Sequence, residues 1–170
     1  MAGETLLQQR VFVGRIMAEI IISIEELQGK LQRLSKALEN KTPLLRRIAN
    51  TLQNTIEESF DKQASPFGEK WKDNAPSTKR KKQGNKILIK SGLLSQSFTS
   101  KITGDSAQIG TNKQYAPIHQ FGGKAGRNKK VNIPARPFLP INKDKQIPQD
   151  LGLELEEMVK EWVEEGFPPL

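Results

Sequence analysis

Hydrophobic residues recur at helical spacing over much of the first third of the chain. Spacings of three and four residues place each of two sets on one helix face. Thr42 and Pro43, in the break between the sets, suit the N-cap and first position of a second helix. The two helices should pair as a hairpin with both stripes in the core, or with part of the first stripe against a neighbouring subunit. The two sets are Ile24, Leu27, Leu31, Leu34 and Leu38, then Leu45, Ile48, Leu52, Ile56 and Phe60.

The segments before the first helix differ sharply in pattern. Residues 18–23 are rich in β-branched side chains and predict a strand. Residues 1–16 show no convincing period, so we expect residues 1–17 to form an N-terminal extension outside the fold.

A β-hairpin is predicted between residues 98 and 111. Residues 98–102 and 107–111 flank a four-residue turn whose Gly104-Asp105 pair suits a two-residue type II′ turn. This register places the apolar side chains of both strands on one face, directed towards the core. The facing pairs are Phe98 with Thr111, Ser100 with Ile109, and Ile102 with Ala107.

The chain is expected to end in one more helix. It should begin near Asp150, after a linker at residues 141–148, and stop at Gly166. We therefore predict an α+β fold, with a small, mostly antiparallel sheet packed with an N-terminal helical hairpin and a C-terminal helix. Residues 18–145 would form a single domain with basic loops at 72–86 and 124–130, and residues 146–170 an acidic helix and tail. The helix should bury Leu151, Leu155, Met158 and Trp162.

Residues 115–139 combine two stiff ends with a basic middle. Pro117, Pro134 and Pro137 each fix their own φ and restrict the residue before them. Gly122 and Gly123 permit a positive φ where a turn needs it. We interpret the segment as two apolar anchors that hold out a solvated, mobile basic loop, which suits a contact surface better than a catalytic pocket. The loop's cations are Lys124, Arg127, Lys129 and Lys130.

Charge is distributed unevenly along the 170 residues, which carry a net charge of +8. Residues 71–145 hold 16 basic and 3 acidic side chains, whereas residues 150–165 hold 7 acidic side chains and only Lys160 as a base. Such a division indicates either complementary contacts between copies, a polyanionic partner, or two solvated faces. The absence of cysteine excludes disulfides and thiolate chemistry. No apolar run approaches the ~20 residues of a membrane span, and the N-terminus has no signal-peptide pattern.

Catalytic residues are not apparent from the sequence. His119 is the only histidine, and no acidic residue lies between Asp105 and Asp144 to partner it in a triad or zinc site. We interpret it as a histidine bonded within its turn. Ser91-Gly92 lacks the context of a hydrolase elbow, and the glycines at 122–126 do not match a phosphate loop. The acidic residues of the last helix could bind divalent cations, but they more often form an exposed face. We therefore predict no catalytic residue, metal or cofactor.

Four short motifs occur in a recognisable order. A lysine-rich segment follows the first motif, and the four together resemble the virion morphogenesis family of tailed bacteriophages and prophages. That family includes Mu-type capsid morphogenesis proteins and P2-type tail completion proteins. The resemblance covers about residues 17–142, although Pro140 stands where the family usually has glycine. The motif residues are Pro66, Gly68 and Trp71; Ser91, Gly92 and Leu94; Tyr115, Ala116, His119, Gln120 and Gly122; and Pro134, Ala135, Arg136, Pro137 and Phe138.

The resemblance implies a structural role in finishing the tail or the head–tail junction, without catalysis. It also implies a ring of copies, contacts with other tail or neck proteins, no membrane, and a location in the host cytoplasm and then the virion. Opposite charges on one chain suit head-to-tail contacts that close a ring. We expect the basic loop to meet Glu161, Glu164 and Glu165 of the last helix. The alternative is a non-specific nucleic-acid-binding protein that uses residues 71–145, with Trp71, Tyr115 and Phe121 available for stacking.

Overall fold

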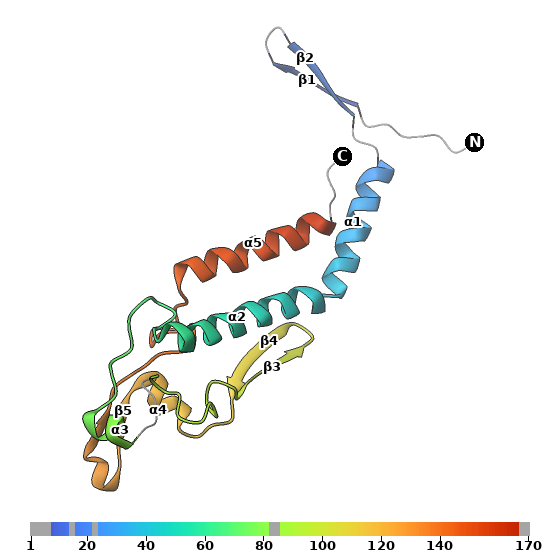
Figure 1. Ribbon diagram of the computed structural model, residues 1–170. Helices are drawn as coiled ribbons and strands as arrows, with labels where there is room; N and C mark the ends of the chain where they lie inside the picture. The colour runs from blue at the N-terminus through green and yellow to red at the C-terminus, as the bar shows by residue number, and fades with distance from the viewer. Residues whose placement is uncertain (1–7, 14–15, 22–23, 82–85, 167–170) are drawn as a thin grey trace. The chain divides into compact units, whose positions relative to one another are not determined.

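The computed structural model describes residues 8–13, 16–21, 24–81 and 86–166 (Figure 1). The described residues form five α-helices, a short 3-10 helix and three two-stranded antiparallel sheets, which confirms the predicted α+β class. The chain divides into two compact units: Met1–Lys41 with Val159–Leu170, and Thr42–Met158. The domain boundaries expected near residues 17 and 145 stay predictions. No helix among the described residues is long and apolar enough to cross a membrane.

The first unit contains a hairpin and a helix. Strand β1 (Gln8–Val13) pairs antiparallel with β2 (Ile16–Ile21), and α1 (Ile24–Glu39) follows over the range of the first predicted stripe. Sequence analysis found no pattern in residues 1–16, but part of this segment forms strand β1. The first half of β1, Gln-Gln-Arg, lacks the apolar alternation that marks a strand, and the strand is defined by its pairing with β2. Residues 22–23 of the strand predicted at 18–23 lie outside the described residues.

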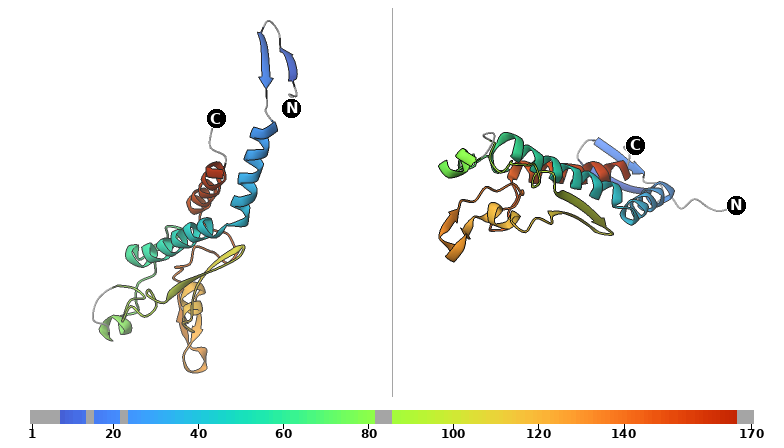
Figure 2. Two further views of the ribbon diagram at one scale, coloured as in Figure 1. Left: turned by 90° about the vertical axis from the view of Figure 1, so that its right-hand side faces the viewer. Right: turned by 60° about the horizontal axis from the view of Figure 1, so that its bottom comes forward.

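The second unit is organised around α2 (Thr42–Lys62), which packs against the hairpin of β3 (Phe98–Thr103) and β4 (Ser106–Thr111). The packing is visible in Figures 1 and 2. The three predicted cross-strand pairs are all present. The turn type was wrong, because a II′ turn needs a positive φ at its first central residue and Gly104 does not have one. Pairing of α1 with α2 as a hairpin remains a prediction, since the two helices belong to different units.

Four aromatic side chains form the centre of the second unit. The Phe60 ring stacks on Phe138 at 5.6 Å and meets the edge of Trp71 at 5.4 Å. Phe98 contacts Phe138 edge-on at 5.4 Å. Each such pair adds about 0.5–1.5 kcal/mol beyond area burial. Aliphatic residues complete this core, which joins α2 to segments far apart in the sequence: Ile56, Ile87, Leu94 and Ala116.

The two segments expected to be basic loops contain regular structure. Residues Pro76–Lys81 form α3, whose first turn begins with Pro at the favourable N1 position. After α4 (Ala116–Phe121), the chain folds into a small hairpin: β5 (Gly123–Ala125) pairs with β6 (Val131–Ile133), and the 3-10 helix η1 (Arg127–Lys129) closes the turn. Three-residue strands are too short for a hydrophobic pattern, so sequence analysis could not find them. Residues 82–85 of the first loop lie outside the described residues.

Helix α5 (Gln149–Gly166) begins and ends close to the predicted positions. Leu151 is buried, and Leu155, Met158 and Trp162 are half-buried. In the second unit, Thr51 of α2 contacts Met158 and Glu154 of α5, with its Oγ1 3.9 Å from Sδ and 3.5 Å from Oε1. α5 therefore lies against α2 along its first half.

Candidate functional site

Gln120 ties the end of α4 to the segment after β6. Its side-chain oxygen accepts hydrogen bonds from the backbone N–H groups of Phe138 and Leu139, both at 2.9 Å. Its amide nitrogen donates to the carbonyls of Leu139 at 3.4 Å and Ile141 at 3.3 Å. The side chain is only 3% exposed, so its polar atoms are satisfied by this segment rather than by water. The third and fourth motifs are thus one structural unit.

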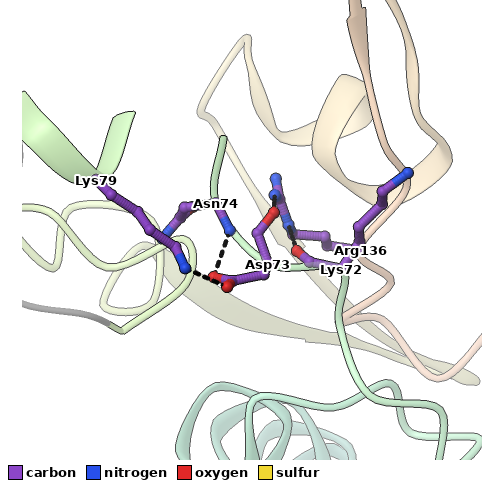
Figure 3. A network of polar contacts seen from close by, with 5 residues as sticks. All are labelled: Lys72, Asp73, Asn74, Lys79 and Arg136. Carbon is purple, nitrogen blue, oxygen red and sulfur yellow. Dashed lines mark hydrogen bonds and ion pairs between the residues drawn. The ribbon is translucent and has the colours of Figure 1, made fainter. Parts of the chain in front are cut away.

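Arg136 joins the fourth motif to the segment that follows Trp71 (Figure 3). The guanidinium donates from Nε to the Lys72 carbonyl at 2.7 Å and from Nη2 to the Asp73 carbonyl at 2.9 Å. Its backbone N–H donates to the His119 carbonyl at 2.7 Å. Burial lowers the pKa of Arg136, and the Asp73 carboxylate opposes that shift. At 6% exposure, the residue acts as a structural clamp rather than as a free cation.

Asp73 is the acidic member of this polar network (Figure 3). Its carboxylate forms an ion pair with Lys79 of α3 and accepts the Asn74 backbone N–H at 2.6 Å. The hydrogen bond from Lys79 and then the one from Asn74 lower the pKa of Asp73. The pair fixes α3 beside the Arg136 clamp. Sequence analysis did not single out Asp73, although it is one of only three acidic residues between 71 and 145.

The first motif supplies a turn and a core anchor. Gly68 has a φ of +86° and donates its N–H to the Ser65 carbonyl at 2.8 Å, while the Ser65 hydroxyl accepts the Phe67 N–H at 3.1 Å. Trp71 is 5% exposed, and its indole N–H donates to the Pro137 carbonyl at 2.7 Å. Trp71 therefore holds the Pro137 backbone against the core. Pro66 and Gly68 line a separate cavity of about 590 Å³ between α2 and the start of α5.

The second motif lies in a chain of turns rather than in a strand. Gln63 holds its beginning, because its side-chain oxygen accepts the Ile87 N–H and its amide donates to the Phe60 carbonyl at 2.5 Å. Gly92 has a φ of +74°, and its carbonyl accepts the Gln96 N–H at 3.0 Å. Leu88 has a φ of +59°, which is costly for a side chain of its size. Leu94 is buried in the core, so the turns are fixed from both sides.

Residues of the second, third and fourth motifs line one cavity of about 830 Å³, the basic groove. The segment after Trp71, α3, the second motif, α4 and β6 all contribute to it. Lys72, Lys81 and Lys90 are exposed at its walls, and an apolar surface lines much of the rest. The lining residues are Lys72, Asp73, Asn74, Ala75, Ser77, Thr78, Lys81, Leu88, Lys90, Ser91, Gly92, Leu93, Leu94, Tyr115, His119, Val131, Asn132, Ile133, Pro134 and Arg136.

His119 lies at the wall of the basic groove. Its ring meets that of Tyr115 edge-on at 6.1 Å, and its Nδ1 is buried without a hydrogen-bond partner among the described residues. Burial lowers the pKa of His119, and the nearby Arg136 charge lowers it further. The imidazole is therefore neutral at neutral pH. We expected the His119 side chain to form a hydrogen bond within its turn, but Nδ1 forms none. The backbone carbonyl of His119, not its ring, accepts the hydrogen bond from Arg136.

The remaining predicted site residues are at the surface. The hairpin tip, defined as Lys124, Arg127, Lys129 and Lys130, has all four side chains exposed. Glu161 and Glu164 on α5 are exposed too, while the Glu165 side chain lies outside what the structure describes. Gly122 has a φ of +72°, and a Cβ there would come within 2.9 Å of the Ala135 nitrogen. Among the described residues, no group of three or more acidic or histidine side chains is placed to hold a metal ion.

Sequence analysis missed the three groove lysines as a group. Lys72, Lys81 and Lys90 are far apart along the chain, and each is one of many lysines between 71 and 145. Their segments are brought together by the Arg136–Lys72 hydrogen bond, the Asp73–Lys79 ion pair and the Gln63–Ile87 hydrogen bond. No local signal could have selected them.

Comparison with known proteins places these motifs in a family. The model of the phage virion morphogenesis family matches residues 22–163. Mu-like prophage FluMu G protein 2 of Haemophilus influenzae is 39% identical over 135 residues, covering 79% of this chain and 88% of the relative. FluMu G protein 1 of the same organism is 30% identical over 143 residues, covering 79% and 92%.

A phage protein is also similar to this chain. Putative capsid assembly protein G of Escherichia phage Mu is 29% identical over 131 residues, covering 73% of this chain and 83% of the relative. No solved structure gives a significant match. The family match includes all four motifs and the whole of the second unit. The chain therefore belongs to the phage virion morphogenesis family.

Proposed function

We propose that this chain is a structural component of virion assembly that completes the tail or the head–tail junction as a ring of identical subunits. The observation that carries the proposal is the family match over residues 22–163. In this role the protein acts in the cytoplasm of the bacterial host during assembly and then remains in the virion. Its partners are further copies of itself and other tail or neck proteins. The chemistry of such a role is binding rather than catalysis.

Two charged surfaces support self-association. The hairpin tip presents four exposed cations on a short, closed turn. The last turns of α5 carry exposed Glu161 and Glu164, where the helix macrodipole disfavours negative charge by about 0.3–1 kcal/mol each. A cationic surface from a neighbouring copy would relieve that cost. Because the two surfaces differ, the contact is heterologous and can close a ring.

Removing the protein from its phage or prophage tests the function directly. After induction of a deletion strain, we expect electron micrographs to show complete heads and tails that are unfinished or unjoined. Purified protein added to the lysate should restore infectious particles. If heads fail to form instead, the protein acts in capsid assembly, as the name of the phage Mu relative states, and the junction role is wrong.

Charge reversal tests the ring. Changing Glu161, Glu164 and Glu165 together to Lys should weaken self-association in low salt, as measured by light scattering, and leave the circular dichroism spectrum unchanged. The matched control changes Glu39, Asp61 and Glu69, which are exposed acidic residues elsewhere, to Lys. A triple variant that assembles like the parent at every salt concentration would show that the acidic end of α5 is only a solvated face.

Non-specific nucleic-acid binding is a second candidate, supported by the exposed hairpin tip. Tyr115 and Phe121 are exposed and could stack on bases. Trp71 is buried in the core and cannot, which removes one of the three aromatic residues considered for stacking. DNA contact would be an accessory to assembly rather than the main activity.

A further inference from the structure

We propose that the basic groove is the docking site for α5 of a second copy of this chain. The part that docks is the outer stripe of α5, defined as Leu153, Glu156, Glu157, Lys160 and Glu164. The proposal rests on the proposed ring and names the surfaces that meet in it. Three observations carry it: the chemistry of the groove, the chemistry of the stripe, and the continuity of the groove with the hairpin tip.

The groove combines cations with an apolar surface. Lys72, Lys81 and Lys90 supply three exposed positive charges, while Asp73 is neutralised by its ion pair with Lys79. Leu93, Tyr115 and Val131 are 60%, 43% and 52% exposed, so the apolar part is open to a partner. Leu93 and Val131 have no ring to stack on a base and gain little from phosphates, so these two side chains favour a protein over a nucleic acid. The occupant it fits is acidic and carries an apolar anchor.

The outer stripe of α5 has this chemistry. α5 contacts α2 through Met158, and Leu151 is buried on the same side of the helix. The stripe residues lie on the opposite side at spacings of three and four. Leu153 is 60% exposed and is surrounded by glutamates. One leucine can enter the apolar part of the groove while Glu156 and Glu164 face the groove lysines. This arrangement of an apolar anchor within a charged rim is usual in protein interfaces.

The groove also continues into the hairpin tip. Val131, Asn132 and Ile133 of β6 form one wall of the groove, and Lys130 of the tip directly precedes Val131. A helix lying in the groove would therefore also meet the tip cations. The groove and the stripe are different surfaces of the chain, so each copy can use its groove for one neighbour and its stripe for another.

Cysteine crosslinking tests the contact on a clean background, because the chain has no cysteine. One preparation carries Leu93→Cys and the other Leu153→Cys, so a disulfide that joins the two variants must be intermolecular. Mixed and oxidised, they should give the 93–153 disulfide, identified by mass spectrometry, since the bond requires Cβ atoms about 4 Å apart. The control pairs Lys101→Cys, on the exposed side of β3, with Leu153→Cys and should give only background linkage.

A charge swap provides the second readout. Lys81→Glu with Lys90→Glu should weaken self-association by about tenfold or more, and Glu156→Lys with Glu164→Lys should do the same. All four changes in one chain should restore most of the association, which two purely structural defects would not do.

The outcomes separate this contact from the ring itself. If the protein assembles but shows neither the 93–153 crosslink nor restored association in the fourfold charge-swap variant, the groove is not the docking site. The ring is then formed through another contact. If the full chain stays monomeric at every concentration, both proposals are wrong. If a single-stranded oligonucleotide protects the Leu93→Cys thiol from labelling and self-association does not, the groove is a nucleic-acid site and the docking proposal is overturned.

Discussion

The side-chain oxygen of Gln120 accepts a 2.9 Å hydrogen bond from the backbone N–H of Phe138, eighteen residues further along the chain. Phe138 is fully buried among Phe60, Phe98 and the other core residues. The bond therefore connects the end of α4 to the aromatic core and closes the base of the β5–β6 hairpin. The position of the hairpin tip, and of one wall of the basic groove, depends on this link.

We expect Gln120→Leu to destabilise the fold by about 2–4 kcal/mol. Leucine has a similar size but leaves the N–H groups of Phe138 and Leu139 buried and unpaired, at about 1–3 kcal/mol each. Urea unfolding followed by circular dichroism measures the change. Gln108→Leu, on the exposed side of β4, is the matched control and should lie within about 0.5 kcal/mol of the parent. Equal stability of the two variants would contradict the stabilising role of the Gln120 hydrogen bonds.

Elements defined by local pattern could be predicted from the sequence. The register of the β3–β4 hairpin follows from alternation on both sides of a short turn, and α2 and α5 follow from helical spacing and end signals. In the β3–β4 hairpin, the structure corrected only the type of the turn. The Lys-rich α3 was mistaken for a loop because its six residues bury no side chain and so show no apolar face.

The candidate site depends on contacts that no local pattern contains. The Arg136 guanidinium binds the carbonyls of Lys72 and Asp73, more than sixty residues away. Backbone carbonyls occur at every residue, so nothing in the sequence marks these two as partners. The motif residues could be listed from the sequence, but the groove they surround could be found only from the structure.

Gly122→Ala should destabilise the protein, whereas Gly104→Ala should not. Alanine at 122 would have to adopt a φ of +72°, which costs about 1–2 kcal/mol, and its Cβ would come within 2.9 Å of the Ala135 nitrogen. Gly104 has no positive φ and no atom within 4 Å of an added Cβ. Thermal unfolding of the two variants compares them directly. A melting temperature for Gly122→Ala as high as for Gly104→Ala would show that the backbone after α4 is not constrained as described.

Acidification should weaken the fold through His119. Burial lowers the pKa of His119 below its ordinary value of 6.5, so the unfolded chain binds this proton more readily than the folded chain. His119 therefore has no effect on the pH dependence of stability well above pH 6.5. Stability falls as the pH drops below 6.5 towards the pKa of His119 in the folded chain. Urea unfolding in steps of pH measures the slope. Because His119 is the only histidine, His119→Gln should flatten the slope between pH 6.5 and the range where carboxylates titrate.

A slope unchanged by His119→Gln would show that the imidazole has the same proton affinity in the folded and unfolded chain. The opposite slope would show that the folded chain binds this proton more tightly. Asp73 is the internal comparison. Its pKa is lowered by Lys79 and Asn74, so its ion pair persists to lower pH than an ordinary aspartate would allow. Asp73→Asn should therefore leave the slope near pH 6 unchanged.

Duplex DNA binding, where it occurs, should be weak, non-specific and steeply dependent on salt. The hairpin tip presents exposed cations on a short turn rather than a helix that reads base edges, so its contacts would be to phosphates. Changing Lys124, Lys129 and Lys130 to Gln should reduce the slope of log affinity against log salt by about 0.9 for each phosphate that is no longer neutralised. Fluorescence anisotropy with unrelated duplexes, from ~50 to ~200 mM salt, measures both the slope and any sequence preference.

The control changes Lys70, Lys101 and Lys143, which are equally exposed but outside the tip. If the control loses as much affinity as the tip variant, binding reflects overall charge and not the tip. A sequence preference that survives ~200 mM salt would instead favour a dedicated DNA-binding function.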